Sequence, residues 1–360
     1  MASTSLSVGH PPPNLPRAGA PDGGRSRATM RDVAALAGVS VKTVSRVVNE
    51  ESGVKADVRA RVLAAATRLD YRHNLAASNL RRSRARTGVI GVLVQDLGNS
   101  FSASLVRALE DAWRDRGLMV LAASLDEAAE REQQIVENLI TRRVDGLVIV
   151  PASPRHDYLA PEIRAGLPVV FADRLPRGID TDSVTTDNRR GAFLAINHLV
   201  HVGHRRIAVL TDAPSIATAE ERISGVQDAL AAHGREGTLD LLHTGIRSEA
   251  DAEAAVRALM AEPSPPTAIF AARNVLAQGS VRALAAMGLR HSVALVGFDD
   301  FPLAQLLDPP LTVVRQDVAR LGRLVGTRLL ERLDGDTSAP IHEVINPTLI
   351  ARGSGEIPPS

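Results

Sequence analysis

From Gly88 onward, short apolar runs rich in β-branched residues alternate with longer stretches whose apolar residues recur at helical spacing. This alternation is typical of parallel strands joined by helices that cover both faces of a sheet. The runs that predict strands are Val89–Val94, Val120–Ala123, Leu147–Val150, Val169–Phe171, Ile207–Leu210, Ala268–Phe270 and Leu295–Phe298. They are too many for one comfortable sheet, so we expect two α/β lobes.

A body of two such lobes predicts a cleft that binds a small molecule, because ligands of open α/β sheets lie beyond the carboxyl ends of the strands. The 360 residues contain no Cys, which excludes thiolate metal sites, iron–sulfur clusters and thiol nucleophiles. The sequence has no P-loop, dinucleotide fingerprint or G-x-S-x-G elbow. We therefore expect a binding protein rather than an enzyme, with no cofactor and no bound metal.

The two ends of the chain differ from the body in composition. Residues 1–28 are rich in Pro and Gly and lack the apolar run of a secretory signal. No stretch approaches the roughly 18 uncharged apolar residues that span a bilayer. We expect a disordered arm over 1–28, a tail over 354–360, no membrane association and a cytoplasmic location.

Residues 29–73 predict short helices separated by turn residues. Thr29 begins the first helix, with Asp32 completing a capping box, and Gly38 ends it. Val33, Leu36 and Ala37 are expected to form its apolar side. Ser40 predicts the cap of a second helix, from Val41 to about Val48, whose inward face is Val44, Val47 and Val48. A third helix is expected over about Ala56 to Leu69.

Charge is concentrated at this end of the chain. From Thr29 to Thr87 there are 12 Lys or Arg against 5 Asp or Glu, although the whole chain has a net charge of only +1. A basic head on an acidic body indicates a nucleic-acid-binding module. The alternative is a small helical bundle whose basic face is merely solvated.

Two helices separated by a Gly-containing turn, the second with a polar outer stripe, are typical of a helix-turn-helix motif. Lys42 and Arg46, one helical turn apart, are expected to reach base edges, and Val41 to contact a thymine methyl. Phosphate contacts that set the register without reading sequence are expected from Thr29, Ser40, Ser45 and Asn49.

These residues resemble a known family. The run from Arg31 to Asn49, RDVAALAGVSVKTVSRVVN, followed by DYRHN at 70–74, resembles the head of LacI/GalR-type bacterial repressors. The resemblance covers nearly all of residues 29–353. It includes RVDGL at 143–147, GHRRI at 203–207 and VGFD at 296–299.

The resemblance implies a hinge helix from Asn74 to about Arg82 that folds on double-stranded operator DNA, with Leu80 inserted into the minor groove. The DNA-contacting residues that it implies are Thr29, Ser40, Val41, Lys42, Thr43, Ser45, Arg46, Asn49, Tyr71, Asn74, Ala77 and Leu80. A homodimer on a palindromic operator is expected, because one head makes too few base contacts. The chain departs from the family at His73, where relatives often have Pro, and at Lys55, where Ser or Thr usually caps the third helix.

For the body, the resemblance implies a fold similar to periplasmic sugar-binding proteins and a sugar or sugar derivative as effector. It places on the effector site Phe101, Asp187, Arg222, Arg247, Arg273 and Asp299. Arg273-Asn274 replaces a common Asn-Asp pair, and Arg247 stands where some relatives stack an aromatic ring. Three arginines at one cleft favour an anionic effector, whereas an Arg273–Asp299 pair would close the pocket and leave a weak ligand response.

Two weaker signals concern single residue types. His198, His201 and His204 have a spacing compatible with a metal, but Gly203 is expected to end their helix and turn His204 away. Trp113, the only Trp, is expected in the core or at an interface.

The predicted architecture is an all-α helix-turn-helix head over 29–73, a hinge helix and linker over 74–87, and a two-lobed α/β body with parallel sheets over 88–353. Lobe 1 is expected over about 88–187 plus 317–345, and lobe 2 over about 188–316 plus 346–353. The predicted function is a DNA-binding transcriptional regulator, most simply a repressor controlled by a small molecule. The alternatives are a cytoplasmic solute-binding protein and a DNA-binding protein that needs no ligand.

Overall fold

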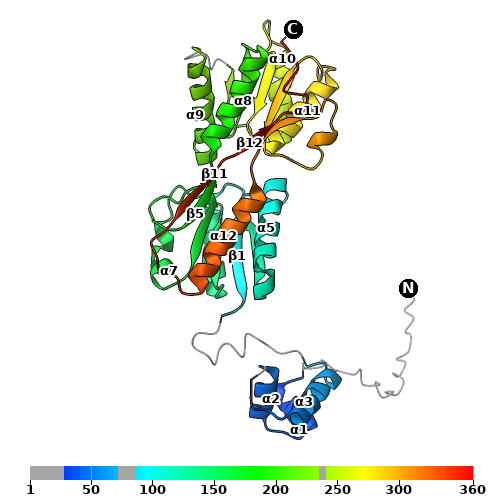
Figure 1. The fold of residues 1–360 in the computed structure, drawn as a ribbon, viewed down its shortest axis with the longest axis vertical. Helices are drawn as coiled ribbons and strands as arrows, with labels where there is room; N and C mark the ends of the chain where they lie inside the picture. Colours follow the sequence, from blue (N-terminus) through cyan, green and yellow to red (C-terminus); the bar gives the residue numbers. More distant parts are fainter. Residues whose placement is uncertain (1–27, 50, 72–85, 235–240, 360) are drawn as a thin grey trace, which may run out of the picture. The chain divides into compact units, whose positions relative to one another are not determined.

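The structure is a computed structural model that describes residues 28–49, 51–71, 86–234 and 241–359. These residues fall into two units, a head that ends before Arg84 and a body that follows it (Figure 1). None of the described helices is long and apolar enough to cross a membrane. The predicted arm up to residue 27 and the predicted hinge helix lie outside the described residues.

The head contains three helices around a small apolar core, as the sequence predicted. They are α1 (Met30–Ala37), α2 (Val41–Val48) and α3 (Ala56–Arg68). Val33, Val44 and Val62 are fully buried at the centre of this core. The prediction for Leu36 was wrong: its side chain is 44% exposed, and Ala34 is buried in its place. The reason is that the inward face of α1 runs through Val33, Ala34 and Ala37.

Helix ends in the head follow the local sequence. Thr29 and Asp32 form a capping box at the start of α1, and Gly38 ends the helix with a φ of 64°, in the left-handed region that Gly tolerates. Ser40 caps α2 by accepting a hydrogen bond from the Thr43 amide. Lys55 offers no capping bond at the start of α3, as its replacement of Ser or Thr predicted.

Lobe 1 is built on a six-stranded parallel sheet in the order β11-β5-β4-β3-β1-β2. Its strands are β1 (Val89–Val94), β2 (Met119–Ser124), β3 (Gly146–Ile149), β4 (Val169–Asp173), β5 (Ser183–Thr186) and β11 (His342–Ile345). Its α-helices are α5 (Ser100–Trp113), α6 (Ala129–Thr141), α7 (Ala160–Arg164) and α12 (Val318–Leu333). Short 3₁₀ turns lie at Arg114–Arg116 and Asp157–Leu159.

Lobe 2 repeats this plan with the order β12-β10-β9-β8-β6-β7, in which only the β10–β12 pair is antiparallel among the described strands. Its strands are β6 (Ile207–Leu210), β7 (Leu242–His243), β8 (Ala268–Ala271), β9 (Ala294–Phe298), β10 (Thr312–Arg315) and β12 (Thr348–Ile350). Its helices are α8 (Asn188–Val202), α9 (Ala217–Ala232), α10 (Glu249–Met260), α11 (Asn274–Ala286) and a 3₁₀ turn at Ala304–Leu306.

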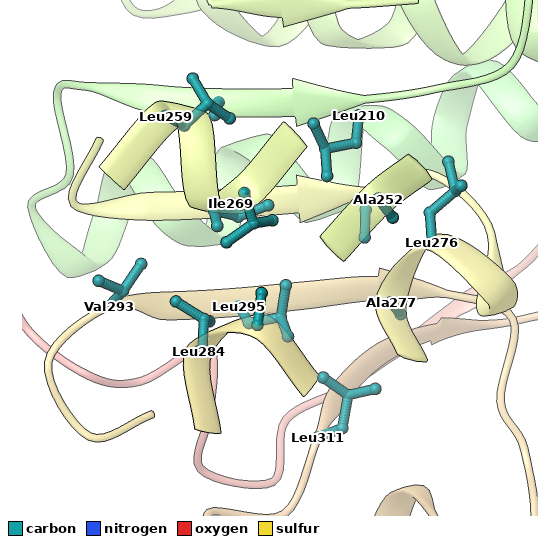
Figure 2. Close-up of a cluster of buried hydrophobic side chains, with 14 of the residues drawn as sticks. Leu210, Ala252, Leu259, Ile269, Leu276, Ala277, Leu284, Val293, Leu295 and Leu311 are labelled. Atoms are coloured by element: carbon teal, nitrogen blue, oxygen red, sulfur yellow. The ribbon is translucent and has the colours of Figure 1, made fainter. Parts of the chain in front are cut away.

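Each lobe has a core on both faces of its sheet, as the apolar runs predicted. In lobe 1, α5 and α12 cover one face and α6 and α7 the other. In lobe 2, α8 and α9 cover one face, while α10 and α11 pack on the opposite face (Figure 1). Figure 2 shows this second core, where Leu284 from α11 lies over Leu295 of β9. Trp113 is also core, fully buried in lobe 1 with its indole N–H donating to the Gly326 carbonyl at 3.1 Å.

The chain passes between the lobes three times, after β5, after β10 and after β11. The first two passages each end on an aspartate that caps the next helix: Asp187 accepts from the Arg190 amide and Asp317 from the Arg320 amide. Near the C-terminus, the Ser354 carbonyl accepts a hydrogen bond from the Leu295 amide of β9, which ties this segment to lobe 2. Residues 353–359 are therefore part of lobe 2.

Two pairs of helices in lobe 2, α8 with α9 and α10 with α11, pack in close contact at glycines. A Cβ at Gly225 of α9 would lie 2.0 Å from the Arg189 carbonyl oxygen of α8. A Cβ at Gly279 of α11 would lie 2.2 Å from the Glu249 carbonyl oxygen of α10. Only glycine permits these contacts, which lock α9 onto α8 and α11 onto α10.

Candidate DNA-binding face and effector cleft

The outer side of α2 is the candidate DNA-binding face. Val41, 40% exposed, and Lys42 are exposed, while Ser45 and Arg46 are half-buried. The Ser40 and Thr43 hydroxyls are 2.9 Å apart at the start of the helix. Val44 and Val47 face the head core, so the residues predicted to read bases and the core-forming residues of α2 lie on different sides.

The other predicted DNA contacts are placed by local hydrogen bonds. Thr29 donates from its amide and its hydroxyl to Asp32 Oδ2, each at 2.7 Å, and the hydroxyl bond is the main cause that lowers the Asp32 pKa. Asn49 Nδ2 donates to Ser45 Oγ at 3.2 Å. Tyr71 packs against the head core, where burial raises its pKa. The predicted contacts outside the described residues are Asn74, Ala77 and Leu80.

The candidate effector cleft lies where the strands of both lobes end. Its cavity has a volume of about 30 Å³. Its lining residues follow the carboxyl ends of strands or begin helices, as expected for open α/β sheets. They are Gln95, Asn99, Phe101, Ser102, Val150, Asp173 and Arg174 from lobe 1, and Asp212, Thr218, Arg222, Arg273, Asn274, Asp299 and Gln316 from lobe 2.

Arg222 lies at the centre of this cleft. It is fully buried on α9, with its guanidinium 3.8 Å from the centroid of the Phe298 ring. Nε donates to Asn188 Oδ1 at 2.9 Å, and Nη1 donates to the Ala272 carbonyl at 2.6 Å. Burial lowers the Arg222 pKa, and the nearby Asp299 and Asp173 carboxylates oppose that shift. The guanidinium is therefore held by two hydrogen bonds and a ring contact, and two buried carboxylates favour its charge.

Asp173 and Asp299 occupy equivalent places in the two lobes. Asp173 ends β4 and Asp299 follows β9, and their φ values are 67° and 69°. Burial raises the pKa of Asp173 to about 6 and also raises the pKa of Asp299. Gln316 Nε2 donates to Asp299 Oδ1 at 2.6 Å.

The remaining cleft arginines already have carboxylate partners. Arg174 donates from Nη1 and Nη2 to the two Glu127 carboxylate oxygens at 2.7 and 2.6 Å. Arg273 Nη1 donates to Asp212 Oδ1 at 2.7 Å. Arg273 therefore pairs with Asp212, not with Asp299 as one interpretation of the sequence had it. The cleft lining itself contains three arginines and three aspartates.

Four buried polar atoms of the cleft have no hydrogen-bond partner among the described residues. Two are donors, Arg174 Nε and Arg273 Nε, and two are acceptors, Asp173 Oδ1 and Gln316 Oε1. A buried polar atom without a partner is costly, and its usual partners are water or a ligand. A hydroxyl group both donates and accepts hydrogen bonds, so a molecule with several hydroxyls can pair with all four of these atoms.

Two asparagine amides connect the lobes at the edge of the cleft. Asn99 Nδ2, at the start of α5, donates to Asn274 Oδ1 at 2.9 Å. Asn274 Nδ2, at the start of α11, returns the bond to Asn99 Oδ1 at 3.1 Å and also donates to Ser100 Oγ at 3.0 Å. These bonds hold the two lobes together in the conformation that the structure describes.

Four of the six predicted effector residues line the cleft: Phe101, Arg222, Arg273 and Asp299. The other two lie elsewhere, since Asp187 caps α8 and Arg247 is exposed before α10. The lining residues that the sequence interpretation missed include Asp173, Arg174 and Asp212. Asp173-Arg174 and Asp212 follow two predicted strands within three residues, so the rule for strand ends was a signal that could have found them.

His198, His201 and His204 are not brought together as one group of ligands. No group of three metal-ligating side chains occurs among the described residues. Gly203 ends α8, as predicted, and His204 then turns into lobe 2, where its Nδ1 is 2.9 Å from Thr267 Oγ1. Burial lowers the pKa of His204.

Family comparisons agree with this architecture. Residues 29–74 match the family model of bacterial regulatory proteins of the lacI family. Residues 87–351 match the model of periplasmic binding proteins and the sugar binding domain of the LacI family.

Individual relatives match over almost their full lengths. The ribose operon repressor of Haemophilus influenzae is 31% identical over 91% of this chain and 98% of its own. The transcriptional repressor CytR of Escherichia coli is 30% identical over 91% of this chain and 96% of its own. The crystal structure of a lac repressor dimer bound to operator and the anti-inducer ONPF aligns with a TM-score of 0.79 and 29% identity, covering 92% of this chain and 99% of its own. The chain therefore belongs to the LacI family of bacterial regulatory proteins, and joins that family's helix-turn-helix head to its sugar-binding domain.

Proposed function

We propose that this LacI-family repressor binds an inverted-repeat operator as a homodimer and that a neutral, hydroxyl-rich small molecule of the sugar class binds its cleft. Binding of this effector changes operator affinity by the difference in its affinity for the two states of the protein. The observation that carries the effector class is the set of two donors and two acceptors around the cleft that have no hydrogen-bond partner among the described residues.

Charge supports a neutral effector over an anionic one. Arg174 and Arg273 are bonded to Glu127 and Asp212, and the charge of Arg222 is already favoured by the buried Asp299 and Asp173. An incoming phosphate or carboxylate would have to compete with these carboxylates at a buried site. A sugar hydroxyl adds no charge and bonds to carboxylate and guanidinium alike.

The exposed side of α2 supports DNA recognition. Lys42 and Val41 present a cationic and an apolar group to solvent on one side of the helix, which suits the major groove. The operator-bound structure among the relatives is described as a dimer, and two heads related by a two-fold axis read an inverted repeat.

Selection from a random DNA library tests the operator proposal. We expect the purified full-length chain to enrich an inverted repeat whose two halves each match one head. Enrichment of a single, non-repeated half-site would contradict the homodimer. Failure to enrich any sequence would favour the solute-binding alternative.

Calorimetry with a matched pair of ligands tests the effector class. We expect neutral sugars, tested with ribose first because the relatives include a ribose operon repressor, to bind at least tenfold more tightly than their phosphate esters. Tight binding of ribose 5-phosphate alone would contradict a neutral effector and restore the anionic hypothesis.

A regulator that works without a ligand is the second candidate. The cavity of about 30 Å³ has room for only about two water molecules, so a sugar enters only if the lobes or side chains move. The Asn99–Asn274 hydrogen bonds join the two lobes and favour the arrangement that the structure describes. Selective DNA binding combined with no heat from any neutral or phosphorylated sugar would support this candidate.

A further inference from the structure

The side chain of Arg46 folds onto the turn that joins α2 to α3. Its Nη2 donates to the Ser52 carbonyl at 2.6 Å, and its Nε lies 3.6 Å from Glu51 Oε2. The Arg46 and Glu51 side chains are 40% and 38% exposed. The guanidinium is thus fixed in one orientation while part of it remains open to solvent.

The turn is anchored so that it can hold this side chain. The Glu51 amide donates to the Arg46 carbonyl at 2.9 Å, and Arg59 Nη2 from α3 donates to the Glu51 carbonyl at 3.0 Å. Gly53 has a φ of 86°, and a Cβ there would lie 3.0 Å from Arg46 Nη2. The backbone of the turn is therefore tied to both helices, and Gly53 leaves room for the guanidinium.

These contacts use one edge of the guanidinium, the edge formed by Nε and Nη2. Recognition of guanine needs two parallel N–H groups from one edge, directed at O6 and N7. Among the described residues of the head, no group bonds Nη1, so the second edge, Nη1 with the remaining Nη2 hydrogen, is left for a ligand. An arginine that is already ordered loses less rotamer entropy when it binds.

We propose that Glu51 is a positioning residue that holds Arg46 ready to bind guanine, so that sequence discrimination depends on an acid whose own charge opposes DNA binding. This inference rests on the proposed DNA-binding function. It gives Glu51 two effects of opposite sign. Its charge lowers affinity for every DNA sequence, and its contact with Arg46 raises the preference for one base pair.

The experiment compares five forms of the full-length chain: wild type, Glu51→Gln, Arg46→Ala, the double variant and Asp57→Asn. Asp57 lies in the first turn of α3 and serves as the control for loss of one acidic charge from the head. The probes are the inverted repeat enriched from the random library, the same duplex with single base-pair changes, and random DNA, all at one ionic strength. The base pair that Arg46 reads is the one at which Arg46→Ala loses discrimination.

We expect Glu51→Gln to lower discrimination at this base pair by about three- to tenfold while affinity for random DNA rises. In the Arg46→Ala background, Glu51→Gln should cause no further loss of discrimination, because its effect acts through Arg46. Asp57→Asn should strengthen binding to all of the duplexes alike. A purely structural role for Glu51 would weaken binding to every duplex.

The inference is overturned if Glu51→Gln keeps or raises the discrimination ratio, or if Arg46→Ala loses discrimination at no base pair. Both outcomes leave the proposed function standing, because the wild-type chain still prefers its selected site. A wild-type chain that prefers no sequence contradicts the proposed function itself, and this inference with it.

Discussion

Replacing Arg222 with Ala should abolish effector binding and destabilise the body, while operator binding in the absence of effector changes by less than about twofold. The guanidinium is buried, interacts electrostatically with Asp299 and Asp173, and donates hydrogen bonds to the Ala272 carbonyl and Asn188. Without it, the buried Asp299 and Asp173 carboxylates lose a cation that favours their charged forms. We expect a loss of about 3–5 kcal/mol in the free energy of unfolding and of at least about 30-fold in affinity for the neutral sugar.

Urea denaturation of the full-length chain and calorimetry with the sugar measure these two effects. Arg189→Ala is the matched control, because Arg189 is an exposed arginine of lobe 2 that pairs with Asp228 on the surface. The control should cost no more than about 1 kcal/mol and leave sugar affinity unchanged. An Arg222→Ala protein with wild-type stability or wild-type sugar affinity would show that this side chain does not organise the cleft.

Replacing Asp173 with Asn should stabilise the ligand-free protein above pH 6 but not near pH 4. Burial raises the pKa of Asp173 from 3.8 to about 6 in the folded state, so the folded state binds a proton more tightly than the unfolded state. The stability that this group contributes is therefore complete below pH 3.8 and lost as the pH rises through about 6. The difference between the two pKa values corresponds to about 3 kcal/mol.

Asparagine cannot ionise, and it tolerates the positive φ of this position. The gain in the free energy of unfolding over wild type should therefore grow from near zero at pH 4 to about 3 kcal/mol at pH 7.5. It is measured by urea denaturation at pH 4, 5, 6 and 7.5. The same variant should bind the sugar less tightly, because one carboxylate oxygen, an acceptor, is replaced by an NH2 group, which can only donate.

Asp182 provides a control of opposite sign. Burial opposes its ionisation, but hydrogen bonds from Arg332 and Arg328 prevail and lower the pKa of Asp182. Asp182→Asn should therefore destabilise the protein at pH 7.5 and have less effect as the pH falls below 3.8. If the two Asn variants show the same dependence on pH, the assignment of Asp173 as a buried, electrostatically strained acid is wrong.

The fold could be predicted where a segment carries its own signal. The helices of the head follow from caps and from valines at helical spacing, and the strands buried on both faces follow from apolar β-branched runs. The strands that were not predicted include β5, with its sequence SVTT, and the two-residue β7. Their residues are polar or few, and pairing with neighbouring strands makes them strands.

The site was harder to predict because it depends on contacts between distant segments. The strand-end rule identifies the right edge of each sheet but not which carboxylate reaches which arginine. Asp212 and Arg273 are 61 residues apart in sequence and 2.7 Å apart in space, and only the fold joins them. Arg247 illustrates the converse, because a position matched to the family by sequence alone turns out to be exposed and outside the cavity.

The most direct test of a sequence-reading head is the affinity of the full-length chain for its selected inverted repeat and for a scrambled duplex of the same composition, measured across a range of salt concentrations. Both affinities should fall steeply with salt, because phosphate contacts release counterions. The ratio between them should remain at least about 1,000 at moderate ionic strength. Equal affinity for the two duplexes at every salt concentration would contradict the account, because α2 would then bind charge without reading bases.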